Sequence, residues 1–336
     1  MGAEIVIKNF RSVSRSRIEL SSPVTLLVGA NGVGKTSLLY SIELLAKASD
    51  GSLPKTPQPG KGCESSCLSV SLGKDRYEAV IETGPSGSVT VRDPALAPDS
   101  IQTLLRNSRI YRFDAPAVEA GVVESTPQVL ASGGQNLAAV LGWMRENSQA
   151  TYQALLREVR CVAPYVSDFV STSEGGESDS QVLGWKQTKT GDTLRFESLG
   201  SGVFKFVLLC AALMQPSPPK LLLLDDPTAG LDSLAASLLC ELMHNFGANG
   251  GTVVASTQTS WFVDGFSVDE VLLVGRNDRE GTVVSAPCPD CLAGFEDCNL
   301  GWLWESGILA PALQHTAIPA HIKDTGNTVE RGKGRE

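Results

Sequence analysis

Residues 24–37 read VTLLVGANGVGKTS, an apolar run that breaks into glycines and ends in a lysine followed by two hydroxyl residues. The run 24–28 is short, apolar and ended by a glycine, which is typical of a strand buried in a parallel sheet. Residues 36–48 then carry leucines and alanines at helical spacing. The pattern G-x-x-x-x-G-K-T between a strand and a helix predicts a phosphate-binding loop.

The residue types of this loop explain how it would hold phosphate. Glycines permit a sharp turn that brings backbone N–H groups against phosphate oxygens, where the helix dipole is positive. We expect Lys35 to reach the β- and γ-phosphates and Thr36 to offer its hydroxyl to Mg²⁺. An ordinary glycine turn is the alternative, and the strand and helix on either side disfavour it. The predicted nucleotide-binding residues here are Gly29, Ala30, Asn31, Gly32, Val33, Gly34, Lys35, Thr36 and Ser37.

Composition sets broad limits. A chain of 336 residues can form two average domains or one large α/β domain with insertions, and 42% hydrophobic residues suffice for a sizeable core. The net charge of -9 argues against a protein that coats nucleic acid through its overall field, although a local basic groove could still bind it. No leader pattern and no apolar stretch approaching ~18 residues is present, so we expect a cytoplasmic protein without a membrane partner.

Eight cysteines in a chain of this length do not indicate a disulfide framework. Cys161, Cys210 and Cys240 lie in apolar helical patterns and are expected to act as small core residues. Zinc-compatible spacings occur among the others, but we favour reduced thiols on loops, because no histidine stands close by. These others are Cys63, Cys67, Cys288, Cys291 and Cys298.

The first hundred residues predict a small antiparallel sheet beside the phosphate loop. Runs at 5–13 and 16–20 look like two antiparallel strands that lead directly into the strand of the loop. Residues 50–66 are rich in Gly, Pro, Ser and Lys, which indicates a surface loop. Apolar and polar residues then alternate again, which predicts a meander extending the first sheet over 68–72, 77–81 and 89–91.

Residues 100–200 form an insertion that is predicted to be mostly helical. Apolar repeats at three and four residues predict amphipathic helices around 137–141 and 152–159, with a stop at Pro164. Heptads do not persist over several turns, which argues against long coiled-coil arms. Short runs at 166–170, 182–186 and 194–196 suggest a small hairpin.

Two further predicted strands end in polar side chains. The apolar run 220–224 ends in Asp225 and Asp226, and carboxylates at a strand end suit Mg²⁺. Asp225 would hold the metal together with Thr36, and Asp226 could polarise the attacking water. The run 251–256 is followed by Gln258, at the carboxyl edge where α/β sheets bind ligands. The candidate catalytic residues are therefore Asp226, Gln258 and Lys35.

A second glycine turn precedes the apolar helix predicted at 206–214. It consists of Gly200, Ser201 and Gly202, and its backbone could bind phosphate at the helix N-terminus. The chain's own phosphate loop already serves its own nucleotide, so the nucleotide of a second subunit is the natural target. A helix cap with tight-turn glycines is the alternative.

The chain resembles the ABC-type ATPase heads of the RecF/SMC class through a combination of motifs. These are GANGVGKTS, LGSG, LLLLDDP, AGLD and the polar residue after the last strand. More narrowly, the chain resembles compact bacterial "AAA family ATPases" or AbiEii/OLD-like predicted ATPases, as do the segments IVIKNFRSV, YRFDAP and GGQNLAAVL. The resemblance implies an α/β P-loop NTPase fold of ABC-ATPase head type. It also implies a mixed central sheet with an antiparallel N-terminal β-subdomain and a helical insertion lobe.

The resemblance also suggests how the chain is organised. We expect one head over residues 1–310, without an appended nuclease domain, and a flexible tail at 311–336. Within the head, a β-subdomain with the phosphate loop would occupy residues 1–100. The helical insertion would occupy 101–200, and the second nucleotide-binding half 201–310.

The resemblance implies ATP and Mg²⁺ as cofactors and a head-to-tail homodimer that encloses two ATP molecules. Each ATP would be held by the phosphate loop of one subunit and residues 199–202 of the other. Asp232 would line the dimer seam beside the opposite nucleotide, and Lys205 stands where the group often places arginine.

Three departures from the family pattern are present, and the first two suggest slow hydrolysis. Asp226 replaces the catalytic glutamate, and Gln258 replaces the switch histidine, which accepts a proton far better than glutamine does. No confident counterpart of the glutamine loop is present, since Gln58 lies in the predicted surface loop and Gln102 is a weak candidate. Slow hydrolysis favours an ATPase whose long-lived ATP-bound dimer times a process, over a motor that hydrolyses ATP rapidly.

The leading functional interpretation is an ATPase that controls DNA repair or processing, or an antiphage effector such as a separately encoded nuclease or toxin. The ATPase subunit of a membrane transporter and a non-hydrolysing nucleotide-gated scaffold are the alternatives. DNA is a possible partner through a small basic set near the N-terminal strands, for which we favour a solvated face. This set consists of Lys8, Arg11, Arg15 and Arg17.

Overall fold

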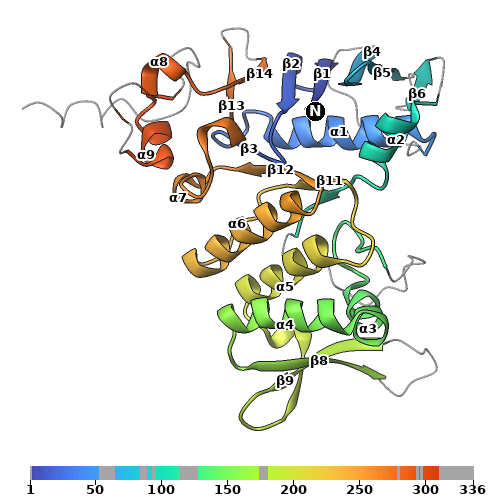
Figure 1. Cartoon of the computed structure of the whole chain (residues 1–336), viewed down its shortest axis with the longest axis vertical. Helices are drawn as coiled ribbons and strands as arrows, with labels where there is room; N and C mark the ends of the chain where they lie inside the picture. Colours follow the sequence, from blue (N-terminus) through green and yellow to red (C-terminus); the bar gives the residue numbers. More distant parts are fainter. Residues whose placement is uncertain are drawn as a thin grey trace, which may run out of the picture.

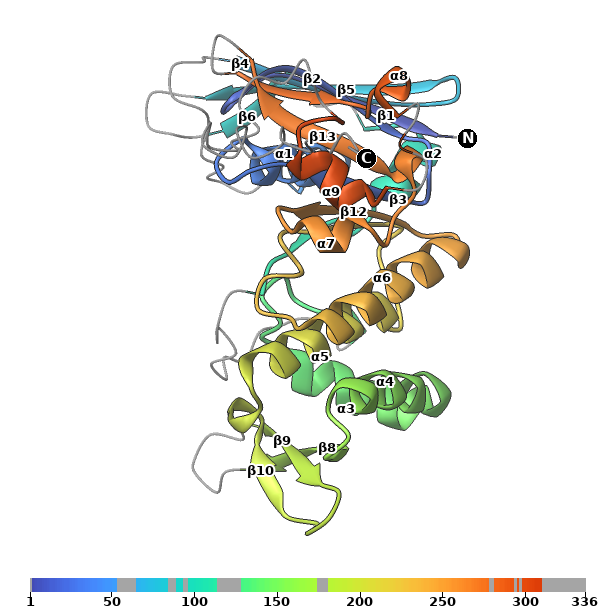
Figure 2. The ribbon, with the colours of Figure 1, turned by 90° about the vertical axis from the view of Figure 1, so that its left-hand side faces the viewer.

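The structure is a computed structural model with an upper and a lower lobe (Figure 1, Figure 2). The upper lobe contains both ends of the described chain, and the lower lobe contains its middle. The residues that the structure describes are 2–52, 65–83, 89–92, 96–113, 128–173, 181–277, 281–292, 295 and 298–309.

A six-stranded sheet in the upper lobe carries the phosphate loop. Its order is β14-β13-β3-β12-β11-β7, in which only β14 runs antiparallel to its neighbour. Every residue of β3 and β11 is buried, because elements cover both faces of the sheet. The strands are β3 (Val24–Val28), β7 (Ile110–Tyr111), β11 (Leu221–Leu224), β12 (Thr252–Thr257), β13 (Val271–Arg276) and β14 (Thr282–Ser285).

The second sheet of the upper lobe is antiparallel and has the order β2-β1-β4-β5-β6. Its strands are β1 (Ala3–Phe10), β2 (Val13–Leu20), β4 (Ser65–Leu72), β5 (Asp75–Thr83) and β6 (Val89–Arg92). The helices α1 (Lys35–Ser49) and α2 (Asp99–Leu105) pack against it and share one apolar core with it. The expected antiparallel N-terminal β-subdomain and mixed central sheet are therefore confirmed.

The two faces of the central sheet belong to different cores. Along β3, Leu27 faces the core of the antiparallel sheet, whereas Leu26 and Val28 face the core that continues into the lower lobe. Successive side chains of a strand point to opposite faces, so one buried strand joins both cores. The helix α6 (Ser233–Ala248) lies between the central sheet and the lower lobe (Figure 2).

The lower lobe combines helices with a small sheet. Its helices are α3 (Leu137–Asn147), α4 (Gln149–Val162) and α5 (Ser201–Met214), and η1 (Phe196–Ser198) is one turn of 3-10 helix. Its antiparallel sheet has the order β10-β9-β8, with β8 (Val166–Ser173), β9 (Gln181–Gln187) and β10 (Thr193–Arg195). The predicted helices are present, and the three short runs predicted as a small hairpin form this sheet, in which Leu194 pairs with Trp185.

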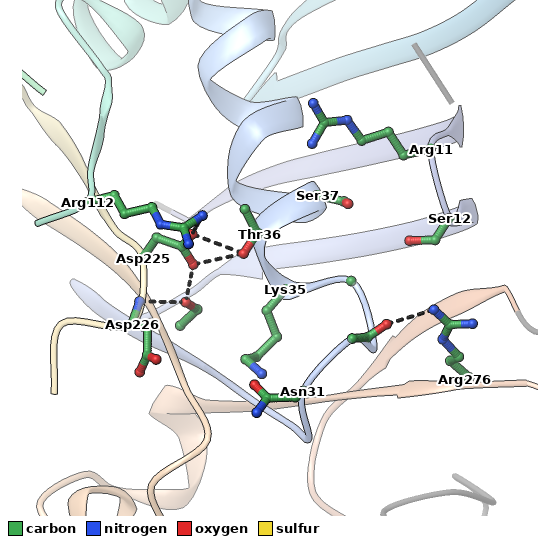
Figure 3. A pocket seen from close by; sticks show the side chains of 13 residues that line it. Arg11, Ser12, Asn31, Lys35, Thr36, Ser37, Arg112, Asp225, Asp226 and Arg276 are labelled. Carbon is green, nitrogen blue, oxygen red and sulfur yellow. Dashed lines mark hydrogen bonds and ion pairs between the residues drawn. The ribbon is translucent and has the colours of Figure 1, made fainter. Parts of the chain in front are cut away.

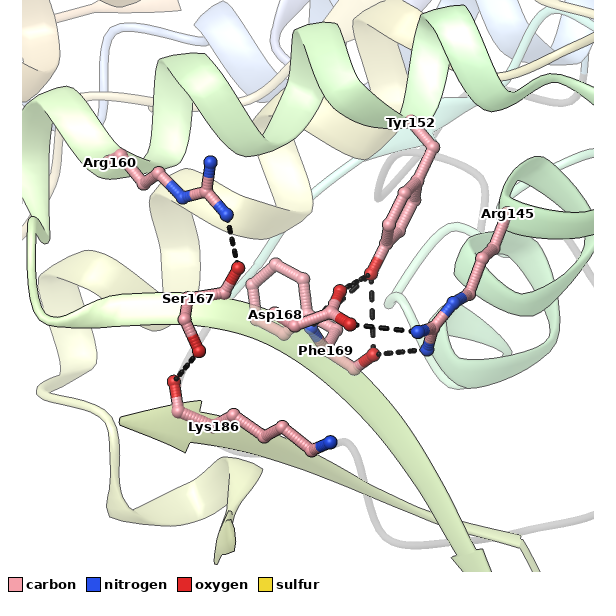
Figure 4. Close-up of polar contacts among 7 residues, drawn as sticks. All are labelled: Arg145, Tyr152, Arg160, Ser167, Asp168, Phe169 and Lys186. Carbon is pink, nitrogen blue, oxygen red and sulfur yellow. Dashed lines mark hydrogen bonds and ion pairs between the residues drawn. The ribbon is translucent and has the colours of Figure 1, made fainter. Parts of the chain in front are cut away.

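A polar network joins the helices of this lobe to its sheet (Figure 4). Asp168 accepts hydrogen bonds from the Tyr152 hydroxyl at 2.6 Å and from Arg145 at 2.8 Å. Arg145 also donates to the Phe169 carbonyl at 3.1 Å. Burial and the neighbouring Asp168 raise the pKa of Tyr152, so this hydroxyl stays a donor. The network fixes the orientation of β8 against α3 and α4.

The C-terminal elements pack beside the central sheet. They are α7 (Ser260–Val263), η2 (Val268–Glu270), α8 (Pro289–Leu292) and α9 (Leu300–Glu305). Trp304 packs into the core, whereas Trp302 is 52% exposed. Among the described helices, none combines the length and apolar character needed to cross a membrane.

Candidate functional site

A cavity of about 460 Å³ opens at the carboxyl edge of the central sheet, where β3, β11 and β12 end (Figure 3). Six residues predicted from the phosphate loop line it, and so do both acids predicted at the end of β11. The six loop residues are Asn31, Gly32, Gly34, Lys35, Thr36 and Ser37. The structure therefore brings together two predicted segments that are almost 200 residues apart in sequence.

The phosphate loop is already closed on itself. Gly34 is the N-cap of α1 and has φ 112, a left-handed conformation that favours glycine. Lys35 Nζ donates to the carbonyl oxygens of Gly29 at 2.7 Å and Ala30 at 2.8 Å. Burial lowers the pKa of Lys35, while Asp226 and Asp225 act in the opposite direction. Val33 is buried, and its carbonyl oxygen accepts from Thr282 at 2.7 Å.

Asp225 lies at the centre of a hydroxyl cluster. Its side chain accepts from the Thr36 hydroxyl at 2.9 and 3.1 Å, and from the Ser256 hydroxyl at 2.7 Å. Asp225 is 6% exposed, so its carboxylate is held in place. Carboxylate and hydroxyl oxygens are the hard ligands that Mg²⁺ prefers, and the predicted metal ligands Thr36 and Asp225 are in direct contact. The donor set therefore fits Mg²⁺.

Asp226 has a strained backbone and an unpaired oxygen. Its φ is 46, and its backbone N–H donates to the Ser256 hydroxyl at 3.0 Å. Its Oδ1 atom is buried without a hydrogen-bond partner among the described residues. Burial raises the pKa of this carboxyl, against the opposing effect of Lys205 and Lys35. A raised pKa makes a carboxylate a better proton acceptor, as the predicted role in water activation requires.

Lys205 connects the turn after β11 to helix α5. Its buried ammonium group donates to the carbonyl oxygens of Asp226 at 2.9 Å and Ala229 at 3.0 Å. A buried charge is tolerated only where such partners satisfy it. Lys205 therefore supports the backbone of the predicted catalytic acid.

The remaining predicted residues lie outside this cavity, as far as the structure describes its lining. Gly200, Ser201 and Gly202 form the N-terminus of α5, and a Cβ atom at Gly202 would lie 2.6 Å from the Gly230 carbonyl oxygen. Asp232 caps α6 by accepting from the Ala235 N–H at 2.8 Å. Gln258 is exposed beyond the end of β12. Their roles in nucleotide binding or hydrolysis stay predictions.

Five cavity residues had no predicted role in this site: Ser12, Ser256 and three arginines. Ser256 lies near the end of the buried strand β12, beside the strand that Asp225 follows, and this was a usable signal. Arg112 lies within the segment YRFDAP, and Arg276 donates to the Gly32 carbonyl at 2.7 Å. The guanidinium of Arg11 stacks over the Tyr40 ring at 4.2 Å, and burial raises the pKa of that tyrosine. Periodicity did not indicate that these three arginines share a cavity, because Arg11 lies between β1 and β2, Arg112 follows β7 and Arg276 ends β13.

The weaker predictions have mixed outcomes. Gln102 lies on α2 and donates to the Ala97 carbonyl at 2.8 Å, away from the described cavity lining, and Gln58 lies outside the described residues. Cys288 is disulfide-bonded, so the expectation of reduced thiols is wrong for it. Cys161 is exposed, so the prediction of a core role is wrong for it, whereas Cys210 and Cys240 are buried. Within the described ranges, no group of three or more His, Cys, Asp or Glu could hold a metal ion.

Comparisons with protein families match both parts of the chain. A family model described as "AAA ATPase domain" matches residues 1–89. A model described as "AAA domain, putative AbiEii toxin, Type IV TA system" matches residues 86–259, which is more than half of the chain.

Comparisons with curated proteins give shorter matches. The chain is 37% identical over 86 residues to the "Energy-coupling factor transporter ATP-binding protein EcfA" of Methanosphaera stadtmanae, which is 25% of this chain and 31% of that protein. It is 31% identical over 81 residues to the "DNA replication and repair protein RecF" of a Nocardioides species, which is 24% of this chain and 19% of that protein. The chain thus matches less than a third of the length of these relatives.

Solved structures resemble nearly the whole chain. The Smc head bound to the C-terminal winged-helix domain of ScpA has a TM-score of 0.57 at 13% identity, over 84% of this chain and 96% of that one. The Smc head with an extended coiled coil bound to the C-terminal domain of ScpA derived from Pyrococcus furiosus has 0.55 at 12%, over 88% and 98%. The fold is therefore that of an Smc-head-like P-loop ATPase, as the motifs predicted.

Proposed function

This chain belongs to the family of AAA domains described as "putative AbiEii toxin, Type IV TA system", and on that premise we propose that it hydrolyses ATP slowly and dimerises around ATP to control a partner. Its class is that of the ABC, SMC and RecF ATPases. Such ATPases bind nucleotide, usually with Mg²⁺. The hydrolysis rate, the dimer and the controlled process are the parts that we propose.

The observation that carries the proposal is the meeting of Lys35, Thr36, Asp225 and Asp226 around one cavity. Lys35 is positioned to leave its loop carbonyls for a phosphate oxygen, which is a stronger, charged acceptor. Thr36 and Asp225 would hold Mg²⁺, which neutralises charge that develops on the phosphates. Asp226 would accept a proton from the attacking water, helped by its raised pKa.

Slow hydrolysis follows from the residues available for water activation. Asp226 is one methylene shorter than glutamate, and its strained backbone is held by Ser256 and Lys205. Gln258 is exposed, and within the described residues no hydrogen bond joins it to Asp226. Because the Asp226 side chain is short and its backbone is fixed, its carboxylate would activate water slowly. The ATP-bound state would therefore persist.

The dimer is supported by the second glycine turn. Gly200 and Ser201 are exposed at the N-terminus of α5, and a Cβ atom at Gly200 would meet nothing within 4 Å. An accessible helix N-terminus attracts phosphate, yet this one does not line the cavity of its own chain. The phosphate of a second copy, bound in the partner's cavity, is the ligand that we propose for it.

The partner that this ATPase controls would be DNA or a separately encoded nuclease or toxin. The similarity to a protein named for DNA replication and repair and the family description as a toxin support these two possibilities. The similarity to an energy-coupling factor transporter protein keeps the ATPase subunit of a membrane transporter as the second candidate. Copurification with a membrane subunit would favour that candidate over ours.

The test is the molar mass of the Asp226→Asn variant, measured by light scattering with ATP and Mg²⁺. We expect a stable dimer, because binding residues are intact and hydrolysis is blocked. The matched control is the Lys35→Ala, Asp226→Asn double variant, which should stay monomeric. A monomer for Asp226→Asn under saturating ATP would overturn the proposed dimer.

Single-turnover hydrolysis separates the proposal from a non-hydrolysing scaffold. The native protein should convert bound ATP to ADP and phosphate slowly, and Asp226→Asn should bind ATP but release no phosphate. Equal and negligible turnover by both proteins would instead favour the scaffold.

A further inference from the structure

Arg112 forms an ion pair with Asp225, and it is the only residue in the described part of the chain for which such a pair with Asp225 is found. It follows β7, which runs parallel to β11, and the Asp225 N–H donates to the Tyr111 carbonyl at 3.1 Å. The Arg112 N–H donates to the Ser132 carbonyl at 3.3 Å. The backbone at Arg112 is therefore held beside Asp225 from two sides.

The residue before Arg112 makes this position rigid. The Tyr111 ring is 1% exposed, its hydroxyl donates to the Leu130 carbonyl at 3.3 Å, and Gln215 donates to that hydroxyl at 3.1 Å. The side chain of Arg112 is 57% exposed, in contrast. The backbone of Arg112 is therefore fixed, and its exposed guanidinium lies beside Asp225 at the cavity (Figure 3).

The guanidinium lies where a cation is needed. Arg112 Nη1 is 3.7 Å from Asp225 Oδ2, and the other oxygen, Oδ1, accepts from Ser256 at 2.7 Å. Guanidinium is always charged and has only donors, so it can neutralise the carboxylate and bind phosphate oxygens but cannot ligate a metal. A metal ion on Asp225 and the guanidinium would therefore compete for the same carboxylate.

We propose that Arg112 sets the metal dependence of nucleotide binding by serving as a built-in cation at Asp225. Without Mg²⁺, the guanidinium offsets the carboxylate and donates to the triphosphate, so ATP still binds. When Mg²⁺ binds, Arg112 leaves Asp225 to the metal. This inference rests on the proposed function, namely that the cavity takes a nucleoside triphosphate.

The test is the affinity of the full chain for a fluorescent ATP analogue, measured with Mg²⁺ and with EDTA. Arg112→Gln keeps hydrogen-bonding capacity and removes the charge. The ratio of the affinity with Mg²⁺ to that with EDTA should rise about tenfold in the variant, the size of one lost charged hydrogen bond. Arg112→Lys, which keeps the charge, should restore most of the binding in EDTA.

A second readout uses no nucleotide. Electron paramagnetic resonance with Mn²⁺ alone should show tighter metal binding by Arg112→Gln than by the native chain, because the competing cation is gone. Arg276→Gln is the matched control, since Arg276 lines the same cavity but contacts Gly32 instead of Asp225. It should weaken nucleotide binding by a similar factor with and without metal.

An unchanged affinity ratio and unchanged Mn²⁺ binding in Arg112→Gln would overturn the inference while leaving the proposed function intact. Equal losses with Mg²⁺ and with EDTA would also overturn it, since they indicate a simple phosphate contact. If the native chain bound no nucleotide under either condition, both the proposed function and this inference would fail.

Discussion

Two glycine turns open helices in this protein, and they differ in what surrounds them. The turn at residues 29–34 ends at Gly34 with φ 112 and encloses a lysine that is 9% exposed. The turn at 200–202 begins α5 from Gly200 with φ -57 and stands at the surface. The first turn lies at the edge of a sheet that supplies Asp225, Asp226 and Ser256. A glycine turn thus becomes a complete pocket only where a sheet edge adds the acids and hydroxyls.

The largest expected effect concerns the first turn. Lys35→Ala should weaken ATP binding by at least about 100-fold, because it removes a buried, charged donor from the phosphate site. Titration with a fluorescent ATP analogue measures this effect. The control is Lys220→Ala, an exposed lysine at the start of β11, which should bind ATP as the native chain does. Near-native binding by Lys35→Ala would contradict the view that the first turn, unlike the second, forms a complete nucleotide pocket.

The next effect concerns the second turn. Ser201→Glu puts a negative charge at the N-terminus of α5, where the helix dipole favours it, so the monomer should fold normally. The same charge would repel the phosphate of a partner, and the ATP-dependent dimer should weaken by more than about tenfold. Sedimentation of the variant, with Asp226→Asn in the background, measures the dimer. Unchanged dimerisation would mean that this turn binds no phosphate.

A pair of serine variants compares the sheet edge beside the first turn with the second turn itself. Ser256 is fully buried, and its hydroxyl links Asp225 to the Asp226 N–H, so Ser256→Ala should cost about 1 to 2 kcal/mol of unfolding free energy. Ser201→Ala changes an exposed side chain and should cost under about 0.5 kcal/mol. Chemical denaturation without nucleotide measures both. Equal costs would show that the two sites are equally integrated in the fold.

The smallest effect is a pH dependence at Asp226. Burial raises the pKa of this carboxyl above its ordinary value of 3.8. Its ionisation therefore destabilises the folded state as the pH rises above this ordinary value. Asparagine stays neutral and tolerates the positive φ of this position. Asp226→Asn should therefore be more stable than the native chain at pH 7, and its advantage should vanish as the pH falls below about 4.

Thermal denaturation across this pH range, without nucleotide, measures the difference. Asp192→Asn, at an exposed carboxylate in the turn between β9 and β10, is the control and should show no such trend. A constant difference at every pH would mean that burial of the charge is not the cause.

Much of the fold could be predicted because its signals are local. The buried strand, the glycines and the helix of the phosphate loop are contiguous in sequence, and so is the strand that ends in Asp225. The antiparallel N-terminal strands were also predicted from alternation. The three short runs predicted in the lower lobe pair as one sheet, although the pairing of a three-residue strand depends on its neighbour more than on its own pattern.

The candidate site was predicted only in part. Lys35, Thr36, Asp225 and Asp226 meet as expected, but Arg112 joins them from the segment after β7 and Arg276 from the end of β13, and no periodicity reveals the order of these strands. The exposure of Gln258 and the capping of α6 by Asp232 were not foreseen either. The parts assigned to these residues in catalysis and at a dimer seam stay predictions.

The sequence by itself determined the class of this protein, because the residues that grip phosphate and end the buried strands are encoded in short segments with their own periodicity. Only the tertiary structure decided which distant side chains share the cavity. The order β3-β12-β11-β7 sets Ser256 and Arg112 beside Asp225, and that order arises from packing between segments far apart in the chain. Local patterns specify strands and helices, whereas contacts across a sheet depend on the whole fold.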